Sequence, residues 1–337
     1  MLFLVANMNN TIMSTVIVMA TFTCAPVHAE EMADMVNTTA LLEILTAKPK
    51  PFHSRQSEAP DPAIIRLQVL LDRAGASPGV IDGHAGDNVQ KAITAFEAMQ
   101  GLPVDGDLDR ETIARLETRE PIIITYVVSD ADLENLTESI PHDFAKMARM
   151  DHLGFTSVAE RLSERFHMDI DLFHALNPHA TLAVGGKVRV TGTGSPKTGQ
   201  VARIEVDSRR GQARAFEADG LLIAAYPATI GSEETPAPTG NHKVKGVAHL
   251  PDYTYNPKVN FQQGKNADVL TLPSGPNNPV GTVWIDLTKP TYGIHGTPEP
   301  SLIDKVGSHG CVRLTNWDAE ELASMVKPGV AVIFVHE

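Results

Sequence analysis

The residues best suited to chemistry lie in one short run, GSHGCVRL, at residues 307–314. It contains Cys311, one of only 2 cysteines in 337 residues, between His309 and Arg313. A thiol becomes a nucleophile when it ionises, which near neutral pH requires a nearby base, a positive charge or unsatisfied backbone N–H groups. The imidazole, the guanidinium and the amides around Gly310 could supply all three. If the run is extended, side chains 309, 311 and 313 share one face.

Four interpretations of Cys311 remain open on residue type: nucleophile, metal ligand, disulfide partner or core residue. A zinc site would use His295, His309 and Cys311, but the sequence lacks a C-x-x-C or H-x-x-x-H pair and an evident fourth ligand. Cleavage of the N-terminal segment would remove Cys24, leaving only an intermolecular disulfide. A core cysteine rarely lies in a run this rich in glycine, serine, histidine and arginine. The residue chemistry favours a nucleophile.

Two histidines compete as the base for this thiol. His309 is nearest in sequence, but side chains two apart on a strand lie roughly 6 to 7 Å apart, too far for proton transfer without bending. His295 stands in YGIHGTPEP, at the end of a strand-like run and directly before Gly296. A histidine at a strand end, freed by glycine, could reach a neighbouring loop.

Strand patterns surround these residues over 199–337. VARIEVD, LLIAAYPATI, VGTVWIDL, TYGIH and VAVIFV predict strands, and one more strand and a turn at Asp219 and Gly220 separate the first two. NWDAEELASMV, with Asn316 at its start, is the only strong helical pattern in this part of the sequence. We therefore expect a mostly β domain with one helix just after the cysteine run.

Residues 61–118 predict a small three-helix domain. The first two helices place apolar residues at helical spacing, and these are Ile64, Leu67 and Leu71, then Val89, Ala92, Ile93 and Phe96. Gly75 is the predicted stop of the first helix, and Asp87 and Gln90 the predicted capping pair of the second. A third short helix follows Asp109. The repeated Asp-Gly phrases in PGVIDGHAG and LPVDGDLD predict tight turns with a left-handed position.

The segment 119–193 carries a weaker pattern. GFTSVAERLSERFHM predicts a helix with Val158, Leu162 and Phe166 inward, DIDLFHALNP predicts a second helix capped by Asp169, and KVRV predicts a strand. Residues 30–60 contain three prolines and few apolar residues after Leu45, so we expect a linker with one short helix around 39–47.

The N-terminal residues 1–29 have the features of a cleaved signal peptide. Residues 12–23 are apolar or small, and VHA ending at Ala29 has the form of a signal-peptidase site. The run is about half the ~20 residues that a membrane span needs. The lack of Lys or Arg before Lys48 departs from the usual pattern, and TFTC lacks the residues that normally precede a lipid-modified cysteine such as Cys24. We expect an exported, periplasmic protein without a membrane anchor.

The charge balance is acidic. The formal net charge is -13, and Lys and Arg do not cluster. Because phosphate binding needs such clusters, nucleic acid is excluded as a partner.

Two segments before residue 199 resemble wall-binding modules. Residues 61–118 resemble the peptidoglycan-binding domain type 1, through the LQ of the first helix, the G-x-I-D-G-x-x-G turn, A-I-x-x-F-x-x-x-x-G-L and D-G-x-L-D. Residues 154–190 are similar to the end of a LysM module, a strand-helix-helix-strand fold that binds amino-sugar polymers. Its first strand and G-D-T phrase are missing from this pattern, so a spacer is the alternative.

The C-terminal segment resembles the L,D-transpeptidases with a YkuD-type catalytic domain. The resemblance rests on IHGTPEPSLIDKVGSHGCVRLTNWDAEELASMV, together with TPAPTGNHKV and NPVGTVWIDL upstream. It implies a multidomain α+β protein whose sandwich-like catalytic domain, residues 199–337, acts on peptidoglycan tetrapeptide stems without metal or organic cofactor. Another branch of the family has asparagine where this sequence has Arg313.

Carried over by position, the resemblance gives each site residue a role. Cys311 is the nucleophile, His295 the general base, and the carbonyl of Gly296 holds the imidazole. Ser308, His309 and Gly310 shape the loop and its oxyanion-binding amides, and Arg313 binds a substrate carboxylate or fixes the loop. Two alternatives remain: a carboxypeptidase or endopeptidase that uses water, and a non-catalytic peptidoglycan-binding protein. The oligomeric state is not predicted.

Overall fold

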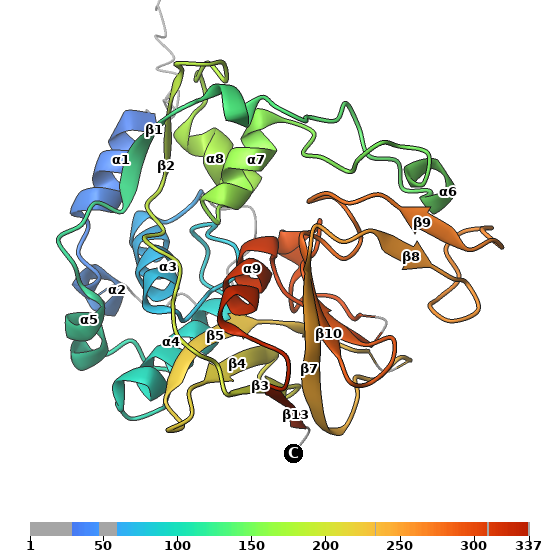
Figure 1. The fold of residues 1–337 in the computed structure, drawn as a ribbon. Helices are drawn as coiled ribbons and strands as arrows, with labels where there is room; N and C mark the ends of the chain where they lie inside the picture. The colour runs from blue at the N-terminus through green and yellow to red at the C-terminus, as the bar shows by residue number, and fades with distance from the viewer. Residues whose placement is uncertain (1–28, 47–58, 233, 309, 336–337) are drawn as a thin grey trace, which may run out of the picture.

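The computed structural model describes residues 29–46, 59–232, 234–308 and 310–335. The described part of the chain starts with a helical region and ends in a large sheet (Figure 1). The five N-terminal helices are α1 (Ala29–Thr38), α2 (Leu42–Thr46), α3 (Pro62–Ala74), α4 (Asp87–Gln100) and α5 (Arg110–Leu116). Among the described residues, no helix has both the length and the apolar character needed to cross a membrane.

Local signals set the ends of these helices. Asp61 accepts a hydrogen bond from the N–H of Ala63 to begin α3, and Gly75, at φ 87°, ends it in the left-handed conformation as predicted. Asp109 likewise caps α5 by accepting from Thr112. The predicted capping pair of α4 is wrong. Gly86, which has no side chain, is its N-cap, and Gln90 donates to the carbonyl of Gly106 in the neighbouring turn.

Within the predicted linker over 30–60, the short helix expected around 39–47 is present as α2. The linker interpretation of the residues before it is wrong, because α1 occupies them and its Ala33 and Val36 are fully buried in the helical core. These two residues lie three apart, so α1 presents one apolar face despite its acidic sequence. Residues 47–58 and almost all of the predicted signal peptide lie outside the described residues.

The segment 119–193 contains the strand that its sequence pattern did not reveal. Its elements are β1 (Ile123–Val127), a 3-10 turn (Asp130–Asp132), α6 (Phe144–Met147), α7 (Val158–Arg165), α8 (Ile170–Leu176) and β2 (Lys187–Thr191). β1 pairs antiparallel with β2, from Ile123 opposite Thr191 to Val127 opposite Lys187. The order strand-helix-helix-strand is therefore present. Residues 128–157, inserted between β1 and α7, separate the strand from the rest of the pattern.

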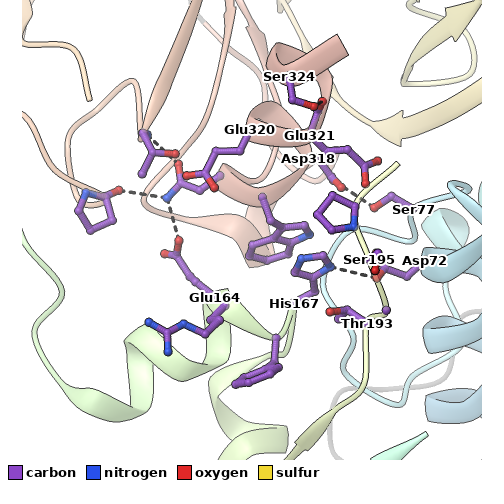
Figure 2. A pocket seen from close by; sticks show the side chains of 18 of the residues that line it. Asp72, Ser77, Glu164, His167, Thr193, Ser195, Asp318, Glu320, Glu321 and Ser324 are labelled. Carbon is purple, nitrogen blue, oxygen red and sulfur yellow. Dashed lines mark hydrogen bonds and ion pairs between the residues drawn. The ribbon is translucent and has the colours of Figure 1, made fainter. Parts of the chain in front are cut away.

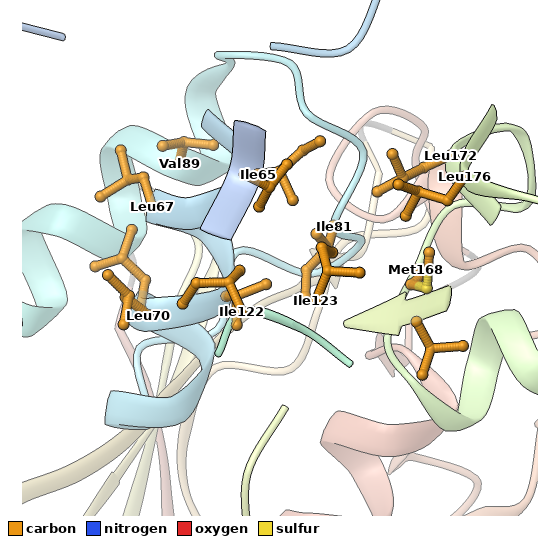
Figure 3. Close-up of a cluster of buried hydrophobic side chains, with 14 of the residues drawn as sticks. Ile65, Leu67, Leu70, Ile81, Val89, Ile122, Ile123, Met168, Leu172 and Leu176 are labelled. Carbon is orange, nitrogen blue, oxygen red and sulfur yellow. The ribbon is translucent and has the colours of Figure 1, made fainter. Parts of the chain in front are cut away.

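One apolar core joins the helical region and the segment 119–193. Figure 3 shows side chains of both packed together, and they include Ile65, Leu67, Leu70, Ile81, Val89, Ile122, Ile123, Met168, Leu172 and Leu176. Ile81 also donates its amide proton to the carbonyl of His167 and accepts one from Asp169. These two segments therefore share a hydrophobic core, which their sequence patterns, treated separately, did not predict.

A nine-stranded sheet forms the C-terminal part of the chain. Its order is β5-β4-β3-β13-β7-β10-β11-β12-β6. The strands are β3 (Arg203–Asp207), β4 (Gln212–Phe216), β5 (Leu222–Pro227), β6 (Thr229–Ile230), β7 (Gly240–His249), β10 (Val283–Leu287), β11 (Gly293–His295), β12 (Val312–Arg313) and β13 (Ala331–Val335).

The long strand β7 connects the two halves of this sheet. Residues 240–243 pair with β13, and residues 244–249 pair with β10. Both halves contribute to one core, which also takes Leu322 and Ala319 from α9 (Asn316–Met325). Thr315 caps α9 by accepting from Asp318, and the helix contacts β10, β11 and α7. The β domain with a single longer helix after the cysteine run is as predicted.

A third apolar cluster lies away from both cores. The hairpin of β8 (Tyr253–Tyr255) and β9 (Leu270–Leu272) packs against α6, at the upper right in Figure 1. Phe144 of α6 contacts the rings of Tyr253, Tyr255 and Phe261 edge to face, with centroids 5.2 to 6.2 Å apart. The insertion 128–157 thus reaches over to the C-terminal half of the chain.

Candidate active site

Two adjacent parallel strands bring the predicted histidine and cysteine into one place. β11 and β12 pair with Ile294 opposite Val312 and His295 opposite Arg313. Cys311 comes directly before β12, so it lies beside the strand that ends in His295. The chain between them leaves the sheet through a short 3-10 turn, Pro300–Leu302, before returning to β12.

The backbone of the next residue fixes the imidazole of His295. Its Nδ1 lies 2.7 Å from the carbonyl oxygen of Gly296. Because a carbonyl can only accept, Nδ1 carries the proton and Nε2 keeps its lone pair. The ring also stacks on Trp284, its cross-strand neighbour in β10, with centroids 5.3 Å apart. This arrangement leaves Nε2 as the basic atom.

Burial keeps this imidazole neutral. His295 is only 4% exposed, and desolvation lowers its pKa to about 4; the bond to Gly296 acts in the opposite direction, and the charge of Arg313 lowers the pKa further. At neutral pH the ring is therefore an unprotonated base.

The thiol of Cys311 is half-buried and reduced. Its Sγ lies 3.8 Å from the carbonyl oxygen of Thr291. Burial raises the pKa of the Cys311 thiol, whereas a backbone hydrogen bond from Gly293 and the charge of Arg313 lower it. The resting pair is thus a neutral thiol and a neutral imidazole, so ionisation of the thiol needs the base.

Ser308 organises the loop that carries the thiol. It is 2% exposed, and its Oγ donates a 2.6 Å hydrogen bond to the carbonyl of Cys311 and accepts one from the amide of Gly310 at 3.3 Å. Its own amide donates to Gly231, and its carbonyl accepts from Thr235. The side chain thus closes a tight turn around the cysteine.

The backbone is not extended at Gly310, so the condition for a shared face is not met. Gly310 has φ +104°, and a Cβ there would lie 2.9 Å from the ring of Tyr292. Only glycine fits this conformation and this space. The predicted loop residue His309 lies outside the described residues.

Arg313 interacts electrostatically with Glu299 and Tyr253, two residues that the sequence did not single out. Burial lowers the pKa of the Arg313 guanidinium, and the charges of Cys311, Glu299 and Tyr253 raise it. Burial, and then the charge of Cys311, raise the pKa of Tyr253 to about 12. Tyr253 comes from β8, far from the motif in sequence, and no local signal marks it.

A cavity between the helical segments and α9 lies apart from this pair. It has a volume of about 700 Å³, and its lining includes Asp72, Glu164, His167 and Asp318 but neither Cys311 nor His295 (Figure 2). Within the described residues, no three His, Cys, Asp or Glu side chains gather in a way that could hold a metal ion.

Comparison with known proteins identifies two domains in the chain. Residues 202–335 match the family "L,D-transpeptidase catalytic domain" (YkuD), and residues 60–116 match the family "putative peptidoglycan binding domain". Neither of these two family matches covers the LysM-like segment.

Two curated Bacillus proteins are among the relatives. "Putative L,D-transpeptidase YkuD" of Bacillus licheniformis is 32% identical over 45% of this chain and 75% of its own length. The protein of the same name in Bacillus subtilis is 33% identical over 33% of this chain and 52% of its own length. A solved L,D-transpeptidase from Xylanimonas cellulosilytica is 19% identical, with 85% of this chain and 99% of that chain covered and a TM-score of 0.36. On the family match and the B. licheniformis relative, the chain belongs to the L,D-transpeptidase family with a YkuD-type catalytic domain.

Proposed function

We propose that this chain is a cysteine-dependent peptidoglycan L,D-transpeptidase that acts on tetrapeptide stems. The observation that carries the proposal is the state of His295. It is a buried, neutral base whose Nδ1 proton is bound to Gly296, on the strand beside Cys311. An oriented, neutral imidazole on the strand beside a thiol is the arrangement that nucleophilic acyl transfer requires.

In the first step, Nε2 of His295 takes the thiol proton while Sγ of Cys311 attacks the carbonyl carbon of the third stem residue. The bond from that carbon to the nitrogen of the terminal D-alanine then breaks, and the imidazolium returns the proton to the leaving amine. A thioester remains on Cys311.

In the second step, the amine of an acceptor attacks the thioester carbon and gives a proton to His295. The carbon–sulfur bond breaks, and the thiolate recovers a proton from the imidazolium. We assign the oxyanion in both steps to backbone amides of the cysteine loop, with the amide of Cys311 foremost because that of Gly310 is bonded to Ser308. Such a donor contributes about 3 kcal/mol of transition-state stabilisation.

Arg313 is our candidate for a stem carboxylate. It is half-buried beside Cys311, and a guanidinium pairs with carboxylates in a fixed fork geometry. Ser308 and Gly310 hold the loop, and we place His309 in the same loop-shaping role. This role comes from its sequence position alone.

The modules before residue 199 would hold the enzyme at the wall. The family match over 60–116 supports binding of peptidoglycan by the helical region. The strand-helix-helix-strand order of β1, α7, α8 and β2 supports a LysM-like module, with glycan as the ligand. With the predicted signal peptide, we place the protein in the periplasm.

Incubation with tetrapeptide muropeptides, followed by mass spectrometry of the products, tests the function. A transpeptidase gives a cross-linked dimer whose mass is that of the acyl donor plus the acceptor less one D-alanine. Trimmed tripeptide without dimer would instead assign water as the acceptor. Bound but unchanged ligand would indicate a wall-binding protein and would overturn the proposal.

A further inference from the structure

We propose that Glu164 and Asn316 form a positioning pair, through which the segment 119–193 holds the general base of the catalytic domain in place. Glu164 belongs to α7, and Asn316 is the first residue of α9. The inference rests on the proposed role of His295 as the base. It adds a contribution to catalysis from outside the 202–335 family match.

The two side chains meet in a buried contact between the two parts of the chain. Nδ2 of Asn316 donates a 2.8 Å hydrogen bond to Oε2 of Glu164. Asn316 is 3% exposed and Glu164 9%. Figure 2 shows Glu164 extending from α7 towards the α9 segment, with this bond drawn as a dashed line.

The carboxamide of Asn316 is fixed in one orientation. Its second Nδ2 proton is donated to the carbonyl of Pro276 at 3.2 Å, and its Oδ1 accepts the amide proton of Thr282 at 3.2 Å. A flip of this amide would place an oxygen against two acceptors and a nitrogen against a donor. The two acceptors, one from each part of the chain, therefore set which way Oδ1 points.

Oδ1 of Asn316 lies directly against the backbone that holds the base. A Cβ placed on Gly296 would be 2.2 Å from this oxygen, and one placed on Gly281 would be 2.0 Å from it. Gly296 is the residue whose carbonyl accepts the Nδ1 proton of His295. The carboxamide of Asn316 thus packs against Gly296. A shift of this carboxamide would move the Gly296 backbone and, with it, the imidazole of His295.

Glu164 has the properties of an uncharged acceptor at this place. Burial first, and then the charges of Glu160 and Glu320, raise the pKa of Glu164 to about 8, while the hydrogen bond from Asn316 acts in the opposite direction. A buried polar group of this kind is costly unless it is bonded, so the bond to Asn316 is an integral part of the interface. A neutral amide of the same length would serve equally well.

A second hydrogen bond connects α7 to the segment 276–282 of the catalytic domain. Oε1 of Glu160 accepts from Nδ2 of Asn277 at 2.6 Å, next to Pro276. The amide of Asn277 also donates to the carbonyl of Leu153. Residues 276–282, which contact Asn316, are therefore held by α7 and by the insertion before it. The position of the general base thus depends on a segment outside the catalytic domain.

The test uses two variants of the full chain that differ only in the acceptor. Glu164→Met keeps the length and volume of the side chain but removes the hydrogen-bond acceptor. Glu164→Gln keeps both the length of the side chain and the acceptor. We expect Glu164→Met to lower kcat with tetrapeptide between about 10- and 100-fold at an unchanged KM, the scale of a small misplacement of a catalytic group. Glu164→Gln should restore wild-type kcat. Ser324→Ala, which removes an exposed hydroxyl from the same cavity, is the control and should match wild type.

The imidazole of His295 can be observed without substrate, by histidine NMR titration, with His295→Ala to assign its signals. Wild type and Glu164→Gln should show the Nδ1-protonated form and titrate near pH 4. Glu164→Met should titrate at higher pH, because a displaced ring becomes more hydrated.

Three results would overturn the positioning role. The first is a His295 titration in Glu164→Met that is unchanged from wild type, and the second is an equal loss of kcat in Glu164→Met and Glu164→Gln. The third is a loss of kcat that is fully explained by a lower melting temperature of the variant. If the chain lacked transpeptidase activity yet the titration still shifted, the pair would stand and the proposed function would fail.

Discussion

Ser308 Oγ donates a 2.6 Å hydrogen bond to the carbonyl oxygen of Cys311 and closes the loop that presents the thiol. Ser308→Ala removes this bond and the acceptor of the Gly310 amide, in a side chain that is 2% exposed. We expect a loss of about 1 to 2 kcal/mol in the free energy of unfolding and a lower kcat. Urea unfolding and steady-state kinetics measure both. Ser324→Ala, on the exposed side of α9, is the control, and a Ser308→Ala variant as active as this control would contradict the role.

The depressed pKa of His295 predicts an unusual acid limit for the reaction. Since the base must be neutral and its pKa is about 4, kcat/KM should stay near its plateau down to about pH 5 and fall as the pH drops through about 4. An ordinary exposed histidine would give a limit near its usual value of 6.5. The pH dependence of kcat/KM decides between the two, with a circular dichroism signal at each pH to establish that the protein is folded.

Asp318 should make stability depend on pH. Burial first, and then the charge of Asp72, raise its pKa to about 8 from an ordinary 3.8, against the effect of His167. A raised pKa gives stability that is complete below the ordinary value and is lost as the pH rises through about 8. For one proton the slope is at most about 1.4 kcal/mol per pH unit.

Asp318→Asn should flatten this slope, because the amide oxygen can still accept from Ser77 without titrating. Unfolding free energies at pH 5, 6, 7 and 8 measure it. A variant with the wild-type slope would assign the dependence to other groups.

The contact between α6 and the β8–β9 hairpin should affect the site through Tyr253. Phe144 is 8% exposed and packs edge to face on Tyr253 and Tyr255. Phe144→Ala should destabilise this cluster by about 3 kcal/mol, increase hydrogen exchange in β8 and β9, and raise KM. Val184→Ala, at a side chain that is 53% exposed, is the control. Unchanged exchange in the hairpin would show that α6 does not hold it.

The placement of His295 and Cys311 at neighbouring strands was predictable because its signals are local. His295 and Cys311 each lie in a short run of glycine and polar residues beside an apolar strand, and those strands are neighbours in the sheet. The helix at 62–74 was equally readable from its apolar spacing and its Gly75 stop, and a short helix was expected after Asp109. Each of these signals lies within a few residues of the feature that it predicts.

The remainder depends on contacts between distant residues. β1 was missed because the insertion 128–157 separates it from its partner β2, and α1 because its burial comes from packing against other helices. Gln90 has the spacing of a capping residue, yet a tertiary acceptor at Gly106 takes its proton. The bond between Asn316 and Glu164 joins residues 152 positions apart. No pattern within either segment could indicate it.

The central claim is that Cys311 carries the acyl group and His295 makes the thiol reactive. Intact-protein mass spectrometry after brief exposure to a tetrapeptide stem measures this directly. Wild type should gain the mass of the stem without its terminal D-alanine, at the one thiol of Cys311, whereas Cys311→Ser should form no thioester and folded His295→Ala should acylate at a rate near background. Undiminished thioester formation in His295→Ala, or an adduct that persists in Cys311→Ser at another residue, would contradict the claim.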